Sequence, residues 1–367
     1  MNPALQKTLA FLLLILAGYL LQRKIVGKQE LAGVKVLILS IVLPATIFVA
    51  LLKIEISATM LLLPLLALLL NGILYAVSAL LLPRLGFRRD TPGWRTMMLL
   101  LPSLAPGLSV FPFILEYLGE APLAMAALAD VGNKVFVLIV LYLVAMNWYY
   151  ARHDTASAAP DRRGKLKDLG LALVQEPVNL VILAAIAMLS FGWTLSDLPV
   201  FLEGTVARLA SLMTPLVLLF IGMAVRFNRR EVPLIVRVLC FRSGLAFLLS
   251  AGLVYLSGLS GPLALLAVIF AQCAVSFWPF AHMSAVEALR GTSGDPVFDL
   301  DLGLNVLAFS LPFSTLVILT VLSCGEWFAA PAVIAPAGVV MCIGPAVYML
   351  RPLLASSREG EVEEAHA

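Results

Sequence analysis

The sequence predicts an all-α integral membrane protein made of two inverted-topology five-helix repeats. Each repeat is expected to contain one broken helix, in the fourth and ninth spans, and these two helices are expected to cross; one extra helix follows at the C-terminus. Three observations predict this fold: a strongly apolar composition, a series of apolar segments of membrane-spanning length, and two proline-interrupted segments at corresponding places in the two halves.

The composition excludes a soluble globular domain. Hydrophobic residues make up 61% of the chain and charged residues 13%, with a mean hydropathy of +1.01, whereas soluble domains are usually about 45–50% apolar. A helix satisfies its own backbone hydrogen bonds in lipid, so a helical bundle fits this composition. A β-barrel would instead show alternating segments of about ten residues.

Apolar segments of roughly 18–25 residues can span a hydrocarbon core about 30 Å thick. The expected spans are 5–22, 31–52, 58–82, 96–118, 122–147, 169–191, 203–225, 233–256, 262–289, 298–323 and 330–350. The domain plan follows: 1–150 is the first repeat, 151–168 a cytoplasmic loop, 169–323 the second repeat, 324–350 the additional helix and 351–367 an acidic cytoplasmic tail. The first apolar run is followed by Gln22, Arg23 and Lys24, so it is expected to be retained as a span.

Lysine and arginine residues gather in alternate loops, which predicts the orientation of the chain. The basic loops lie around residues 23–35, 84–95, 152–167, 226–237, 290 and 351–358. Because basic loops remain cytoplasmic, the N-terminus is expected outside and the C-terminus inside a cell inner membrane. The four cysteines form no C-x-x-C pair. No cofactor, metal or nucleic-acid partner is expected, and the lipid bilayer is the expected surrounding.

Paired prolines indicate an internal repeat. Pro44 and Pro215 are 171 residues apart, and Pro112 and Pro279 are 167 apart. Proline is common in membrane helices, so coincidence is the alternative explanation and one matched pair would carry no weight. Two pairs at nearly one offset favour a repeat, and five spans before the second copy would invert it.

The two interrupted segments are the best pointer to a binding site. The order Ser-x-x-Pro-Phe occurs at Ser109–Phe113 and again at Ser276–Phe280. Proline removes a backbone donor and clashes with the preceding turn, so both helices are expected to unwind and to expose amide ends that favour an anion. The candidate substrate-binding residues are Ser109, Pro112, Gln272, Ser276, Pro279 and His282.

Ionisable residues inside spans are costly and suggest function. Asp130 and Lys134 lie four residues apart on the fifth span, beside Asn133, and Asp301 and Asn305 lie at the start of the tenth. These five are the candidates for coupling to a proton or sodium ion. For Asp130 and Lys134 the alternative is a structural ion pair.

Other polar residues have simpler interpretations. His282 is either a proton carrier or a satisfied core residue. Asp299 is expected to cap a helix N-terminus rather than to couple an ion. Glu176 and Asn179 flank Pro177 and are expected to shape the start of the sixth span, and Arg242 is expected to snorkel toward the basic face.

Several short motifs resemble the auxin efflux carrier family of bacterial permeases. In the first half they are Leu43–Phe48, Tyr117–Gly119 and Asp130–Asn133; in the second they are Thr214–Pro215 and Ile221–Met223. The resemblance covers about residues 5–323, and the more remote bile-acid sodium symporters share the same plan. It implies a ten-helix inverted repeat, a dimer, and transport of organic anions such as auxin-like acids or dicarboxylates at the crossed helices. The eleventh span is an addition to that plan.

The predicted function is therefore secondary active transport of small organic anions by alternating access at the crossed broken helices. A membrane sensor or receptor that binds a ligand there without moving it is the alternative. No nucleotide-binding motif is present, so coupling to ATP within this chain is not expected. No H-E-x-x-H or G-x-S-x-G pattern and no cluster of catalytic carboxylates is present, so an enzyme is not expected.

Overall fold

The computed structural model describes residues 3–22, 24, 28–53, 60, 62–152, 162–224, 232–290 and 295–364, and within them the fold is helical with no strand. Eight helical segments in this part are long and apolar enough to cross a membrane. The helices Pro177–Ser190 and Gly261–Ala271 are apolar but shorter. The predicted class, an all-α membrane protein, is confirmed. Parts of the expected basic loops, 153–161 and 225–231, lie outside the described residues, as do 365–367.

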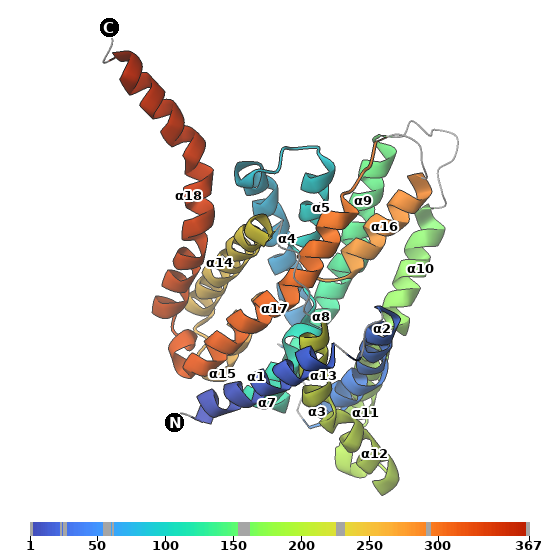
Figure 1. The fold of residues 1–367 in the computed structure, drawn as a ribbon. Helices are drawn as coiled ribbons and strands as arrows, with labels where there is room; N and C mark the ends of the chain where they lie inside the picture. Colours follow the sequence, from blue (N-terminus) through green and yellow to red (C-terminus); the bar gives the residue numbers. More distant parts are fainter. Residues whose placement is uncertain are drawn as a thin grey trace.

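The first half contains nine α-helices in the described residues (Figure 1). They are α1 (Pro3–Leu21), α2 (Lys28–Leu37), α3 (Leu43–Leu52), α4 (Leu63–Leu81), α5 (Pro92–Leu100), α6 (Pro106–Ser109), α7 (Phe111–Tyr117), α8 (Glu120–Val135) and α9 (Leu141–Tyr150). The π-helical turns η1 (Ile38–Val42) and η4 (Phe136–Val140) join α2 to α3 and α8 to α9, so the second and fifth spans are continuous. The 3₁₀ turn η3 (Leu82–Leu85) follows α4.

The second half begins with a helix that starts inside the expected loop and includes the first residues of the expected sixth span. Its elements are α10 (Arg162–Gln175), α11 (Pro177–Ser190), η5 (Leu195–Asp197), α12 (Val200–Ser211), α13 (Met213–Ala224), α14 (Val232–Ser257), α15 (Gly261–Ala271), α16 (Trp278–Arg290), α17 (Leu300–Cys324), η6 (Gly325–Ala329) and α18 (Pro331–Glu364). Helix α10 occupies part of the expected loop. Glu176 has an extended backbone because a residue before proline avoids the α region, so α11 starts separately at Pro177. Helix α18 continues past the expected end of the eleventh span at residue 350.

For description, we divide the helices into two groups, which we name peripheral and central. In the peripheral group, α1 packs on α13, and α3 packs on α11 and α12. In the central group, α4 packs on α8, α14 on α15, and α16 on α9, while α18 covers α14. The groups meet where α3 contacts α8, α13 contacts α7 and α1 contacts α17. Figure 1 shows α2, α3, α11 and α12 together at the lower right, and α14 with α18 at the left.

Small residues allow the closest helix contact within the peripheral group. A Cβ atom on Gly222 of α13 would lie 2.0 Å from the backbone oxygen of Ile15 in α1, and one on Gly18 would lie 2.1 Å from the backbone oxygen of Leu219. Association of helices in lipid depends on such close packing, because lipid is as apolar as the side chains it would replace. The α1–α13 pair is therefore held by backbone-to-backbone contact that a larger residue would prevent.

We expect Gly222→Ala to lower the thermal unfolding temperature of the detergent-solubilised protein, because the added methyl group meets backbone, which cannot yield as a flexible side chain would. Overpacking of this kind typically costs about 1–3 kcal/mol. The control is Gly252→Ala in α14, where nothing lies within 4 Å of the added Cβ; it is expected to leave the temperature unchanged or to raise it through better helix propensity. An equal effect of both substitutions would contradict the close contact.

Candidate functional site

The fourth span is interrupted between α5 and α6. Residues 101–105 are not helical, and two prolines explain why: Pro102 cannot donate in the last turn of α5, while Pro106 is suited to the first turn of a new helix. The Ser103 hydroxyl donates to the Leu100 carbonyl over 2.6 Å. A further bend at Val110 separates α6 from α7, where Pro112 is buried in the first turn. The unwound stretch thus precedes Pro106, whereas the sequence placed the interruption at Pro112, several residues later.

The ninth span is interrupted between α15 and α16. Residues 272–277 are not α-helical, and α16 begins at Trp278, so buried Pro279 falls within its first turn. Proline at that position is tolerated because its missing N–H would be unpaired in a first turn. The Ser276 hydroxyl accepts from the Trp278 N–H at 3.3 Å, which satisfies one of the free amides at this helix start.

The two interruptions lie against each other and share hydrogen bonds. The Ala105 N–H donates to the Ala274 carbonyl over 2.8 Å, and the Ala274 N–H donates to the Ser109 hydroxyl over 3.1 Å. The Ser276 N–H donates to the Ser103 hydroxyl over 3.0 Å. Backbone freed from two helices is thus paired across the gap, as backbone buried away from water must be.

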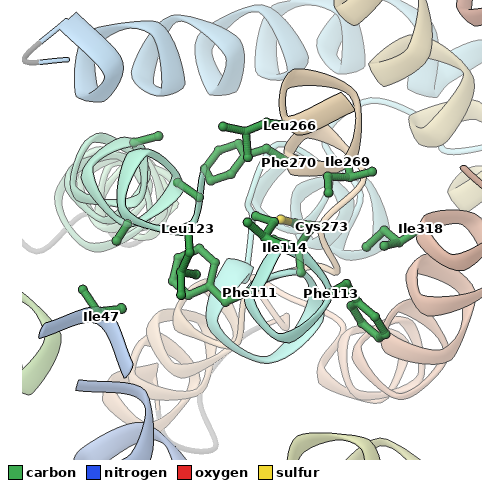
Figure 2. Packing of buried hydrophobic residues seen from close by; sticks show 14 of the residues in the cluster. Ile47, Phe111, Phe113, Ile114, Leu123, Leu266, Ile269, Phe270, Cys273 and Ile318 are labelled. Atoms are coloured by element: carbon green, nitrogen blue, oxygen red, sulfur yellow. The ribbon is translucent and has the colours of Figure 1, made fainter. Parts of the chain in front are cut away.

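Apolar side chains close this meeting point on one side. Figure 2 shows Cys273 of the second interruption beside Ile114 of α7, with Ile269 and Phe270 of α15 nearby. Cys273 and Ile114 are both fully buried. Apolar packing excludes lipid and solvent from the paired backbone, which strengthens each hydrogen bond there.

Arg242 of α14 joins the two interruptions. Its Nε donates to the Leu101 carbonyl over 2.8 Å, its Nη2 to the Ser103 carbonyl over 3.0 Å, and its Nη1 to the Cys273 carbonyl over 2.8 Å. The residue is 4% exposed. The expectation that it snorkels toward the basic face is wrong, because three carbonyls from the ends of α5 and α15 offer acceptors inside the bundle. These helix ends also carry negative partial charge, which favours a cation.

No carboxylate pairs with Arg242 among the described residues. Next to it, Ser243 donates to Oε1 of Gln272 over 2.7 Å, and Nε2 of Gln272 donates to the Ser243 carbonyl over 3.1 Å. Gln272, expected to bind substrate, therefore uses both amide atoms to fix the end of α15 to α14. The guanidinium remains a buried positive charge at the place where the interruptions meet.

A polar network connects α8 to the first interruption. Nδ2 of Asn133 donates to the Leu104 carbonyl over 2.9 Å and to Oδ1 of Asp130 over 2.8 Å. Asn71 of α4 donates to Oδ1 of Asn133 over 3.0 Å. Lys134 lies 3.4 Å from Oδ2 of Asp130, so the pairing predicted from their spacing is confirmed. Asn133 thereby ties the candidate ion-coupling residues directly to the unwound backbone.

Lys134 also reaches the peripheral group. Its Nζ lies 2.5 Å from Oε2 of Glu176 and 3.3 Å from Oδ1 of Asn179, both at the start of α11. Glu176 was expected only to shape the start of the sixth span. Its position in this network could not be read from the chain, because 42 residues separate it from Lys134.

The remaining candidates lie away from the interruptions. His282 on α16 is bonded through Nε2 to the Val137 carbonyl at 2.9 Å and packs edge-on against Tyr142, so it joins α16 to the η4–α9 segment. Asp301 is exposed in the first turn of α17, and Asn305 is half-buried one turn later. Asp299 accepts from the Leu302 N–H over 2.9 Å, which confirms its predicted capping role.

Sequence reasoning missed three residues of this site: Ser103, Glu176 and Arg242. The signal for Arg242 was its place well inside an apolar span, which by default suggests function. Ser103 lies in the same short proline-rich stretch as Ser109 and could have been chosen on that ground.

No protein-family model matches the chain, and no curated protein matches it.

We expect Arg242→Met to destabilise the folded protein strongly, because three buried carbonyls would lose their donors at about 1–3 kcal/mol each. Arg242→Lys should lower the stability less than Arg242→Met, because an ammonium group keeps the positive charge. It should still lower the stability, because an ammonium group cannot reach all three acceptors. Thermal unfolding in detergent measures both. Arg208→Met is the control, because within the described residues the exposed Arg208 side chain bonds only the Gly204 carbonyl of its own helix. Equal unfolding temperatures for the two methionine variants would contradict this role of Arg242.

Proposed function

We propose that this chain is a secondary transporter of small organic anions that works by alternating access where the two interrupted spans meet. The observation that carries the proposal is the hydrogen-bonded meeting of residues 101–105 with residues 272–277 inside a bundle of membrane-spanning helices. Discontinuous spans in corresponding positions of two halves are typical of the substrate sites of such transporters. The inverted repeat, the crossing of the broken helices and membership of the auxin efflux carrier family are parts of this proposal.

The order of elements supports the repeat. Pro44 lies in α3 and Pro215 in α13, each in the second span of its half, and an interrupted span comes fourth in both halves. The two helix groups support relative motion, since the peripheral group contains the first two spans of each half and the central group the other three. We propose that the central group moves against the peripheral group, with the N-terminus outside and the C-terminus cytoplasmic in a homodimer.

Positive charge near the interruptions supports an anionic substrate. Arg242 supplies a buried cation with no carboxylate beside it in the described residues. Lys35 of α2 places its Nζ 4.3 Å from the ring centroid of Phe277, in the second interruption. Phe277 and Trp278 are 48% and 42% exposed, so aromatic surface is available beside that lysine. An aromatic or dicarboxylic acid would match this combination of cation and aromatic rings.

The test is uptake of labelled mono- and dicarboxylic acids by proteoliposomes that contain the full chain. We expect saturable uptake of at least one acid and none in protein-free vesicles. Lys35→Gln is expected to weaken apparent affinity about tenfold, equivalent to ~1.4 kcal/mol of lost attraction. Lys53→Gln, which removes an exposed lysine paired with Glu120, is the control and should match the parent protein.

Two other outcomes of this experiment would reject transport. Binding of an acid without flux, detected as ligand-dependent thermal stabilisation, would favour the sensor or receptor alternative. Neither binding nor flux for any acid in the panel would reject an organic anion as the ligand.

A further inference from the structure

Lys134 is shared by two carboxylates on different helix groups. On its own helix it pairs with Asp130 at 3.4 Å, four residues earlier, and across the group boundary it pairs with Glu176 at 2.5 Å. An i,i+4 pair travels with α8 whatever α8 does, whereas the pair with Glu176 exists only while α8 and α11 keep their present relation. Of the two contacts of Lys134, a motion that separates α8 from α11 therefore breaks the second and leaves the first.

The three side chains carry a net charge of −1 when all are ionised. Helix α11 packs on α3, η1 and α10, and α3 and η1 contain no titratable residue. Among the α10 residues whose side chains the structure describes, the charged ones are Lys167 and Asp168, and both are exposed. Among the described residues, the charged groups that face Glu176 are thus Lys134 and Asp130 of α8.

The two carboxylates are held differently. Asp130 is 6% exposed and keeps a bond from Asn133 as well as its lysine, both on α8. Glu176 is 26% exposed at the start of α11, and its strongest partner belongs to the other group. If Lys134 moved away with α8, Asp130 would remain paired, whereas Glu176 would lose its cation and keep only the backbone hydrogen bond with Asn179 of its own helix among the partners described here. An ionised carboxylate without a cation in such a largely desolvated place is unfavourable.

We infer that Glu176 carries the coupling proton of the transport cycle. Release of Lys134 is matched by uptake of one proton: the carboxylate of Glu176 becomes a neutral carboxylic acid, and the ammonium of Lys134 stays paired with Asp130. Movement in the other direction returns the proton to water as Lys134 pairs with Glu176 again. This inference rests on the proposed function and identifies the coupling ion as a proton, bound in the peripheral group.

The test uses proteoliposomes with the full chain and an acid that the uptake assay has identified. A pH gradient of one unit should raise accumulation of this acid by the parent protein in one polarity and lower it in the other; one proton per anion limits the change to about tenfold. Glu176→Gln mimics the protonated acid permanently. We expect it to keep downhill uptake and to lose the response to the gradient. Glu120→Gln is the matched control, because it breaks the exposed ion pair between Glu120 of α8 and Lys53 at the end of α3. This variant should respond to the pH gradient like the parent protein.

The outcomes separate this inference from the proposed function. No uptake of any acid by the parent protein would reject transport itself. Three results would overturn the role of Glu176. One is uptake by the parent protein that does not depend on the pH gradient, and another is a normal gradient response in Glu176→Gln. The third is a folded Glu176→Gln protein that shows no downhill uptake. Should Glu176→Gln fail to fold, Glu176→Asp replaces it: the pH midpoint of uptake must shift relative to the parent, and an unchanged profile overturns the inference.

Discussion

Pairing of free backbone groups inside the helical bundle is the constraint on which the rest of this structure depends. Two spans lose their helical hydrogen bonds at 101–105 and 272–277, and lipid offers no replacement. The structure resolves this by placing the two stretches together and inserting the guanidinium of Arg242 among three of their carbonyls. Arginine suits this position because its planar fork holds several donors in fixed directions, and it stays charged when buried.

A second consequence is that polar contacts concentrate on the inner faces of α8 and α14. Asn133 bonds the Leu104 carbonyl of the first interruption, and Gln272 at the second is fixed by Ser243, the neighbour of Arg242. Both anchors belong to the central group, so they hold the two interruptions as one unit. The Lys134–Glu176 contact belongs to a different class because it joins that unit to α11, which packs on α3. Contacts within the unit preserve the site, and the contact across the boundary can change with its position.

Much of the fold could be predicted from local patterns. Apolar length predicted the helical membrane class, and Pro112 and Pro279 predicted interruptions in the fourth and ninth spans, because proline disrupts a helix through its own ring and missing N–H. The first interruption lies before Pro106 instead of beside Pro112. The spacing of Asp130 and Lys134 predicted their ion pair for an equally local reason. The roles of Arg242 and Glu176 could not be predicted in this way. Their partners are 31–141 and 42 residues away along the chain, and nothing in the neighbouring sequence specifies them.

The sequence by itself determined that the chain is a helical membrane protein and that two proline-rich segments, one in each half, would be interrupted. Both properties follow from short-range physics: the cost of exposing backbone to lipid and the geometry of proline. Only the tertiary structure decided that the two breaks pair with each other, that a buried arginine holds them, and that Lys134 bridges two helix groups. These outcomes depend on which distant segments approach one another, because each unpaired polar group takes the nearest partner in space, whatever its distance along the chain.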